Sequence, residues 1–125
     1  MKEKRKYLVG AAGVLAAMIS GAMIAPQAAL AEKGVSIVEE GKKIAFNRKK
    51  GNCLACHMMG DGVSPGNIAP PLLAMKSRYP DKAKLRAQIW DPTAVNPDSS
   101  MPPFGKHKLL SATELDKVVE YVWSL

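Results

Sequence analysis

The chain of 125 residues has two cysteines, and both lie in one short stretch, GNCLACHMMG, at residues 51–60. Cys53 and Cys56 are separated by two residues, and His57 follows directly. Two thiols and an imidazole at this spacing are compatible with four kinds of site: a disulfide, a zinc site, a redox-active dithiol, or a covalently attached haem. The choice among these four decides most of the function.

Three of the four sites fit the rest of the sequence poorly. A disulfide between Cys53 and Cys56 would close a very small loop and remove little entropy from the unfolded chain. A redox dithiol of the thioredoxin type is expected within a βαβ pattern, which the sequence lacks. A zinc ion needs four donors, so Cys56 and His57, which are adjacent, would have to converge on it with Cys53 and His107. These three sites remain the alternatives.

The pattern C-x-x-C-H is the attachment signature of haem c. Two thiols one helical turn apart can add to the two vinyl groups at one edge of the porphyrin, and the next residue can then bind the iron. We therefore predict one covalent haem c, attached through Cys53 and Cys56, with His57 as the proximal ligand.

Methionine and histidine are the common ligands opposite such a histidine. The candidates after residue 31 are Met58, Met59, Met75, Met101 and His107. Met58 and Met59 follow His57 too closely to reach the opposite face of the haem. Met101 lies between Ser99-Ser100 and Pro102-Pro103, and the rigid prolines could hold its side chain toward the iron. We predict Met101 as the distal ligand, with His107 as the main alternative, followed by Met75.

A haem-binding histidine also needs an acceptor for its second ring N–H. The segment NIAPPL, residues 67–72, offers the carbonyl of Pro70, because a proline-framed loop presents a carbonyl without a competing donor. We predict that Pro70 orients His57.

Three helices are predicted to position these residues. Ser36 to Glu39 has the pattern of a capping box and precedes a helix over about residues 37–50, ended by Gly51. A short helix spans Asp81–Trp90, with Asp81 as its cap. A second capping box, Ser111 to Glu114, precedes a C-terminal helix with an amphipathic apolar spacing.

The segments between these helices, residues 58–80 and 91–105, are rich in proline and glycine and are predicted to be loops. No strand pattern occurs, so the fold class predicted is all-α. Loops of this length are uncommon in a small domain unless a ligand supplies part of the core. We expect them to form the walls of the haem pocket, with Trp90 packed inside it.

Residues 1–31 have the pattern of a signal peptide, with a basic start, an apolar middle and small residues that suit cleavage after Ala31. The alternative is an uncleaved anchor helix over residues 8–24. Cleavage would leave residues 32–125 as one cytochrome-sized domain, which we expect in the periplasm and not bound to the membrane.

Loss of this leader removes Lys2, Lys4, Arg5, Lys6 and Glu3, and it lowers the formal net charge from +7 to +4. The basic character of the full chain therefore belongs partly to the leader. A nucleic-acid partner is not expected.

These features together resemble class I cytochromes c, which have an N-terminal helix, a CxxCH motif, a proline-leucine loop, a methionine ligand and a C-terminal helix that crosses the first. More specifically the chain resembles SoxX, the monohaem subunit of the SoxAX complex in bacterial thiosulfate oxidation. The segments that carry the resemblance are GKKIAFNRKKGNCLACH (41–57), IAPPL (68–72), IWDPTAVNPDSSMPPFGKHKLL (89–110) and VVEYVWSL (118–125). Ala45, four residues after Gly41, stands where class I helices commonly have an aromatic residue, and Phe46 follows.

The resemblance implies a SoxA-like haem subunit as partner, whose own centre joins thiosulfate to a cysteine of the SoxYZ carrier protein. The chain would pass electrons from the SoxA haem to a small cytochrome c, and no catalysis is expected from it alone. The alternatives are a free-standing periplasmic electron shuttle and a ligand-sensing haem protein. An obligate subunit is expected to expose an apolar patch around Trp90, Pro102, Pro103 and Phe104, whereas a shuttle has a small patch ringed by lysines.

Overall fold

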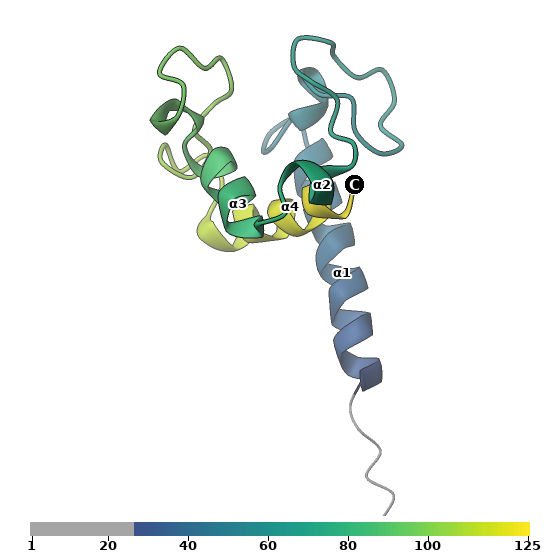
Figure 1. The fold of residues 1–125 in the computed structure, drawn as a ribbon. Helices are drawn as coiled ribbons and strands as arrows, with labels where there is room; N and C mark the ends of the chain where they lie inside the picture. Colours follow the sequence, from purple (N-terminus) through teal and green to yellow (C-terminus); the bar gives the residue numbers. More distant parts are fainter. Residues whose placement is uncertain (1–26) are drawn as a thin grey trace, which may run out of the picture.

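The structure is a computed structural model that describes residues 27–125. Its four α-helices are α1 (Gln27–Phe46), α2 (Met75–Arg78), α3 (Lys82–Trp90) and α4 (Ala112–Ser124), joined by loops that contain two 3₁₀ turns, η1 (Cys53–Ala55) and η2 (Pro92–Ala94) (Figure 1). Within this part of the chain there is no strand, and the only pairing of that kind is an isolated bridge between Met59 and Leu72. The predicted all-α class is confirmed.

The predicted signal peptide, residues 1–31, lies outside the described residues except for its last five, which belong to α1. Its cleavage and the start of the mature domain stay predictions. Among residues 27–125 no helix is both long enough and apolar enough to cross a membrane.

Helices α1 and α4 cross at Gly41, and Figure 1 shows α4 running across α1. A Cβ atom on Gly41 would lie only 1.9 Å from the carbonyl oxygen of Lys117, so glycine permits the two backbones to touch. Ala45 is fully buried next to this crossing, and the ring of Phe46 meets the ring of Tyr121 edge-on at 5.9 Å between centroids. Phe46 thus supplies the aromatic contact, one position later than in the pattern of class I helices.

The predicted bounds of the first helix are wrong at both ends. α1 continues through Ser36, which is therefore not its N-cap, and it stops at Phe46 instead of about residue 50. The last turn is replaced by a turn built on Asn47, whose side chain accepts a hydrogen bond from the N–H of Lys49. The N–H of Gly51 then donates to the carbonyl of Ile44, so the chain folds back on α1 before the cysteines.

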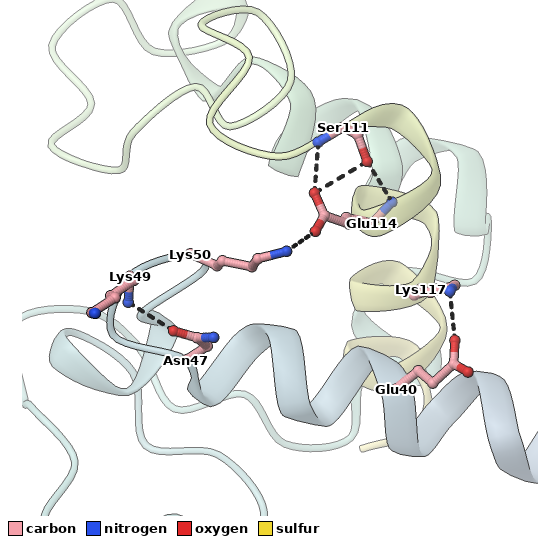
Figure 2. Close-up of polar contacts among 7 residues, drawn as sticks. All are labelled: Glu40, Asn47, Lys49, Lys50, Ser111, Glu114 and Lys117. Carbon is pink, nitrogen blue, oxygen red and sulfur yellow. Dashed lines mark hydrogen bonds and ion pairs between the residues drawn. The ribbon is translucent and has the colours of Figure 1, made fainter.

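The other two helix starts are confirmed. The Asp81 carboxylate accepts a hydrogen bond from the N–H of Ala83 at 2.8 Å, and α3 ends at Trp90, before Asp91-Pro92. Ser111 and Glu114 form a reciprocal capping box at the start of α4, which Figure 2 shows together with Lys50, whose ammonium contacts the Glu114 carboxylate. This contact joins the turn after α1 to the start of α4.

The predicted loops contain more regular structure than their proline and glycine residues indicated. α2 and the Met59–Leu72 bridge lie within 58–80, and η2 lies within 91–105. Met59 and Met75 are each 1% exposed and belong to the same core as Leu115, Val118 and Val122 of α4. The loops therefore contribute core side chains as well as the walls of a cavity.

Candidate functional site

Two adjoining cavities, each of about 360 Å³, lie between the loops that follow α1 and α3. The loops rise on the same side of α4 (Figure 1). Cys53, His57, Met101 and Phe104 line both cavities, so these side chains stand where the two meet. Each volume falls in the range of about 300–1,000 Å³ that is usual for cofactor sites.

The 3₁₀ turn η1 presents the two cysteines. Asn52 has a left-handed backbone conformation (φ 48°), and the N–H groups of Cys56 and His57 both donate to the carbonyl of Cys53. This tight turn brings Cys53 and Cys56 to the cavity wall as free thiols. Burial raises the pKa of the Cys53 thiol to about 11, so the site disfavours a thiolate and suits an uncharged thioether.

The ring of His57 is fixed by the loop opposite. Its Nδ1 lies 2.7 Å from the carbonyl oxygen of Pro70, the acceptor that the sequence indicated. Two backbone hydrogen bonds flank this contact, from Ala69 to the carbonyl of Cys56 (3.0 Å) and from Leu72 to that of Met58 (2.8 Å). With Nδ1 engaged as a donor, Nε2 is the nitrogen available to bind a metal.

Met101 comes from the loop between α3 and α4. Its side chain is partly buried and lines both cavities, and its N–H donates to the hydroxyl of Ser99 at 3.3 Å. The loop turns back toward α3 just beyond it, because the N–H groups of Gly105 and Lys106 both donate to the carbonyl of Trp90.

Of the other candidate ligands, only Met75 lines a cavity. His107 is exposed and lines neither cavity, and Met58 is 46% exposed. Met59 is buried but absent from both cavity walls. Met75 lines one cavity, and its sulfur lies 3.6 Å from the guanidinium of Arg78.

The expectation that Trp90 packs inside the pocket is wrong, and Phe104 lies in the cavity wall. Trp90 does not line either cavity; its ring packs on Gly105, where a Cβ atom would come within 2.1 Å of it, and Arg86 lies 5.2 Å from the ring centroid. Phe104 is only 7% exposed and lines both cavities, so it does not belong to the apolar surface patch that an obligate subunit would expose.

Several cationic side chains also line the cavity walls. Arg78 lines the cavity that α3 walls, here called the inner cavity, and Arg48, Lys49 and Lys50 line the other, here called the outer cavity. Nothing in the sequence indicated Arg78. The run Arg48-Lys49-Lys50 was predicted at the end of the helix over 37–50 and lies instead in a turn beside the motif.

The donors and the surroundings fit a haem. Two thiols, an imidazole with a free Nε2 and a thioether sulfur line the two adjoining cavities, whose walls also include Ile68, Leu85 and Ile89. Among residues 27–125 no group of three or more His, Cys, Asp and Glu side chains is placed to hold a metal ion directly.

Comparison with known proteins gives the family. The family model described as cytochrome C oxidase, cbb3-type, subunit III matches residues 36–122, well over half of the chain. An "Uncharacterized lipoprotein" of Aquifex aeolicus (strain VF5) is 38% identical over 76 residues, which is 59% of this chain and 36% of that protein. The chain thus spans about a third of the length of this relative. The chain belongs to the family of c-type cytochrome domains that this model describes, and it carries covalently attached haem c on the CxxCH motif of Cys53, Cys56 and His57.

Proposed function

We propose that the domain is an electron-transfer cytochrome whose haem iron is bound by His57 and Met101. The observation that carries the proposal is that these two side chains both line the junction of the two cavities, and that the Nδ1 of His57 is already engaged by Pro70. When bound, the haem supplies a one-electron couple at its iron. A methionine opposite a histidine raises the reduction potential and leaves no open position for substrate, which favours electron transfer over catalysis by this chain.

The residues of the chain have separate tasks in this proposal. Cys53 and Cys56 anchor the haem edge, and Pro70 holds the imidazole of His57 in one orientation. Met101 would supply the sulfur ligand of the haem iron, as His57 would supply the nitrogen ligand. Phe104, Leu85 and Ile89 are buried apolar walls that exclude water, which limits the reorganisation that accompanies a change of charge.

Replacement of Met101 by Ala tests the ligand assignment. The long-wavelength charge-transfer absorption of methionine-ligated ferric haem should disappear in this variant, and it should persist in a Met58→Ala control, whose side chain is half exposed. Persistence of the band in Met101→Ala would identify another ligand, and Met75 would be tested next.

More specifically, we propose that the chain is a SoxX-like subunit that accepts electrons from a SoxA-like haem centre and passes them to a small cytochrome. It is supported by the resemblance of IWDP and NPDSSMPPFG to that family. In the structure these segments contact each other through Trp90, Asp91, Gly105 and Lys106, so the two resembling pieces form one unit around Met101. Purification from the native source under mild conditions tests it: a haem-bearing partner is expected in the same assembly. A monomer that elutes without a haem-bearing partner would contradict it.

A free-standing shuttle is the second candidate, and one observation favours it. Arg48, Lys49 and Lys50 line the outer cavity beside exposed Ile68 and Leu109, which gives a small apolar rim with cations next to it. Such a rim suits brief contact with an acidic partner. The buried position of Phe104 also removes part of the apolar patch expected of an obligate subunit.

We further propose that the domain works outside the cytoplasm, in the periplasm, after removal of residues 1–31. The leader pattern supports this location, and the relative from Aquifex aeolicus is named as a lipoprotein. Intact mass spectrometry tests it, because one mass reports both a chain that begins at Glu32 and one covalent haem. A mass that includes residues 1–31 would show that the leader is retained.

A further inference from the structure

The loop that carries Met101 is closed at its neck by contacts between residues 90–93 and 105–106. The carbonyl of Trp90 accepts hydrogen bonds from Gly105 (3.1 Å) and Lys106 (3.2 Å). One oxygen of the Asp91 carboxylate lies 2.8 Å from the ammonium of Lys106. Its other oxygen accepts hydrogen bonds from the N–H and the hydroxyl of Thr93. Asp91 therefore makes contacts within residues 90–93 and to residues 105–106, the two chain segments that form the neck.

The Asp91 carboxylate is more buried than the carboxylate of a usual surface ion pair. Its side chain is only 16% exposed, although Lys106 is 53% exposed, and it caps η2 next to the fully buried Pro92. Exposed ion pairs contribute little because water screens them, whereas a mostly buried carboxylate with several donors contributes more.

The chain segments on both sides of the neck also contribute residues to the cavity wall. On one side Ile89 and Leu85 of α3 line the same cavity as Met101. On the other side Phe104 lines both cavities, and its carbonyl accepts the N–H of Leu110 at 3.1 Å.

The rest of the loop has weaker attachments. Residues 94–98 are exposed, with Val95 at 80%, and the hydrogen bonds of this stretch are local to the loop. The position of Met101 therefore depends on the neck more than on the apex of its loop.

We propose that Asp91 is a positioning residue for Met101: by pairing with Lys106 and capping η2 it closes the loop at its neck and holds the methionine sulfur in the cavity. This inference rests on the proposed function, in which Met101 is the distal ligand. A looser neck would leave Met101 displaced from the site for a larger fraction of the time, and an external ligand would compete more effectively for that position.

The test is the affinity of the ferric holoprotein for imidazole, which replaces the distal ligand. Asp91→Asn and Lys106→Gln should each bind imidazole about two- to fivefold more tightly than the wild type. Asp91→Ala, which also loses the contacts to Thr93, should bind imidazole about tenfold more tightly than the wild type. Lys106→Arg should stay near the wild type because it retains the cation.

The matched control is Glu120→Gln, which breaks an ion pair of the same 2.8 Å length between Glu120 of α4 and Lys82, at the start of α3 and outside the Met101 loop. It should leave imidazole affinity unchanged even if its unfolding temperature falls as much as that of the neck variants. Because thermal unfolding is measured for all variants, a general loss of stability can be separated from a loss of methionine binding.

Equal imidazole affinity in wild type, Asp91→Asn and Lys106→Gln would overturn the inference. If in addition Met101→Ala retains the methionine charge-transfer band, the ligand assignment itself is wrong. If that band is lost in Met101→Ala while the neck variants behave as wild type, only the role of Asp91 is wrong. Should Asp91→Ala fail to fold, Lys106→Gln still decides, because its change lies at an exposed side chain.

Discussion

Gly41 of α1 meets the backbone of Lys117 of α4 with no room for a side chain. A Cβ atom at position 41 would lie 1.9 Å from the Lys117 carbonyl oxygen and 3.0 Å from the Cβ of Tyr121. The crossing also carries an ion pair between Glu40 and Lys117 (Figure 2). The two terminal helices therefore depend on this one glycine to approach each other.

Gly41→Ala should force the helices apart and lower the free energy of unfolding. Overpacking of a tight contact costs about 1–3 kcal/mol, and the clash with a backbone oxygen places Gly41→Ala in the upper half of that range. The better helix propensity of alanine offsets about 1 kcal/mol of this cost. We expect a net loss of about 1–2 kcal/mol in guanidinium unfolding followed by circular dichroism. Lys43→Ala, on the exposed side of the same helix, should change the value by less than about 0.5 kcal/mol. Equal stability of Gly41→Ala and the wild type would contradict the close crossing.

Glu114 links stability to acid pH. The ammonium of Lys50, with Ser111, lowers the pKa of the Glu114 carboxyl from 4.5 to about 2 (Figure 2). A carboxyl whose pKa is lower in the folded state stabilises the fold above its unfolded pKa, and this contribution is lost as the pH falls from about 4.5 toward about 2.

In Glu114→Gln this contribution should be absent at every pH. The wild type should therefore be the more stable protein at pH 7, and the difference in unfolding temperature should shrink between pH 5 and pH 2. Lys50→Gln should reproduce part of this effect. Lys49→Gln is the control, because Lys49 contacts Asn47 through its backbone N–H and not through its ammonium. A difference between Glu114→Gln and wild type that is independent of pH would contradict the prediction.

Local signals in the sequence predicted the elements that depend on neighbouring residues. The caps at Asp81 and Ser111 were visible because a cap needs only one side chain and the next turn. The CxxCH motif was visible for the same reason. The pairing of His57 with Pro70 spans a larger separation, yet it followed from the absence of an N–H on proline, which is a local property.

The wrong predictions concern the start of α1 and the place of one aromatic side chain. Ser36 has a cap pattern, but α1 continues through it, so a local preference did not decide the helix start. Trp90 was expected in the pocket because it is large and apolar; it instead packs on Gly105, whose lack of a side chain makes room for the ring. Phe104 lines both cavities instead. No local pattern in the sequence indicates which of the two aromatic residues faces the cavities.

Removal of both thiols should remove the covalent haem. In Cys53→Ala/Cys56→Ala, the mass of the denatured chain should lack one haem, whereas each single variant should retain a haem through one thioether. The double variant should also unfold at a much lower temperature, because a domain of this size depends on the cofactor for part of its core and the loops around residues 58–80 and 91–105 lose their shared contact surface. Met58→Ala, beside the motif, is the control and should keep the haem. A denatured double variant that still carries haem would exclude the thioether linkage.

The cations beside the outer cavity should steer charged redox partners. Arg48 and Lys49 line that cavity, whereas the ammonium of Lys50 is engaged by Glu114, so Arg48→Gln/Lys49→Gln is the informative variant. Its oxidation by ferricyanide at low ionic strength should slow about three- to tenfold, and the difference should fade as salt is added. Oxidation by a cationic cobalt complex should instead become faster. The control Lys43→Gln/Lys84→Gln removes the same net charge from exposed positions on α1 and α3. If the control slows ferricyanide as much as Arg48→Gln/Lys49→Gln does, net charge and not the cation pair at the cavity governs the encounter, and the support for a shuttle-type docking surface is lost.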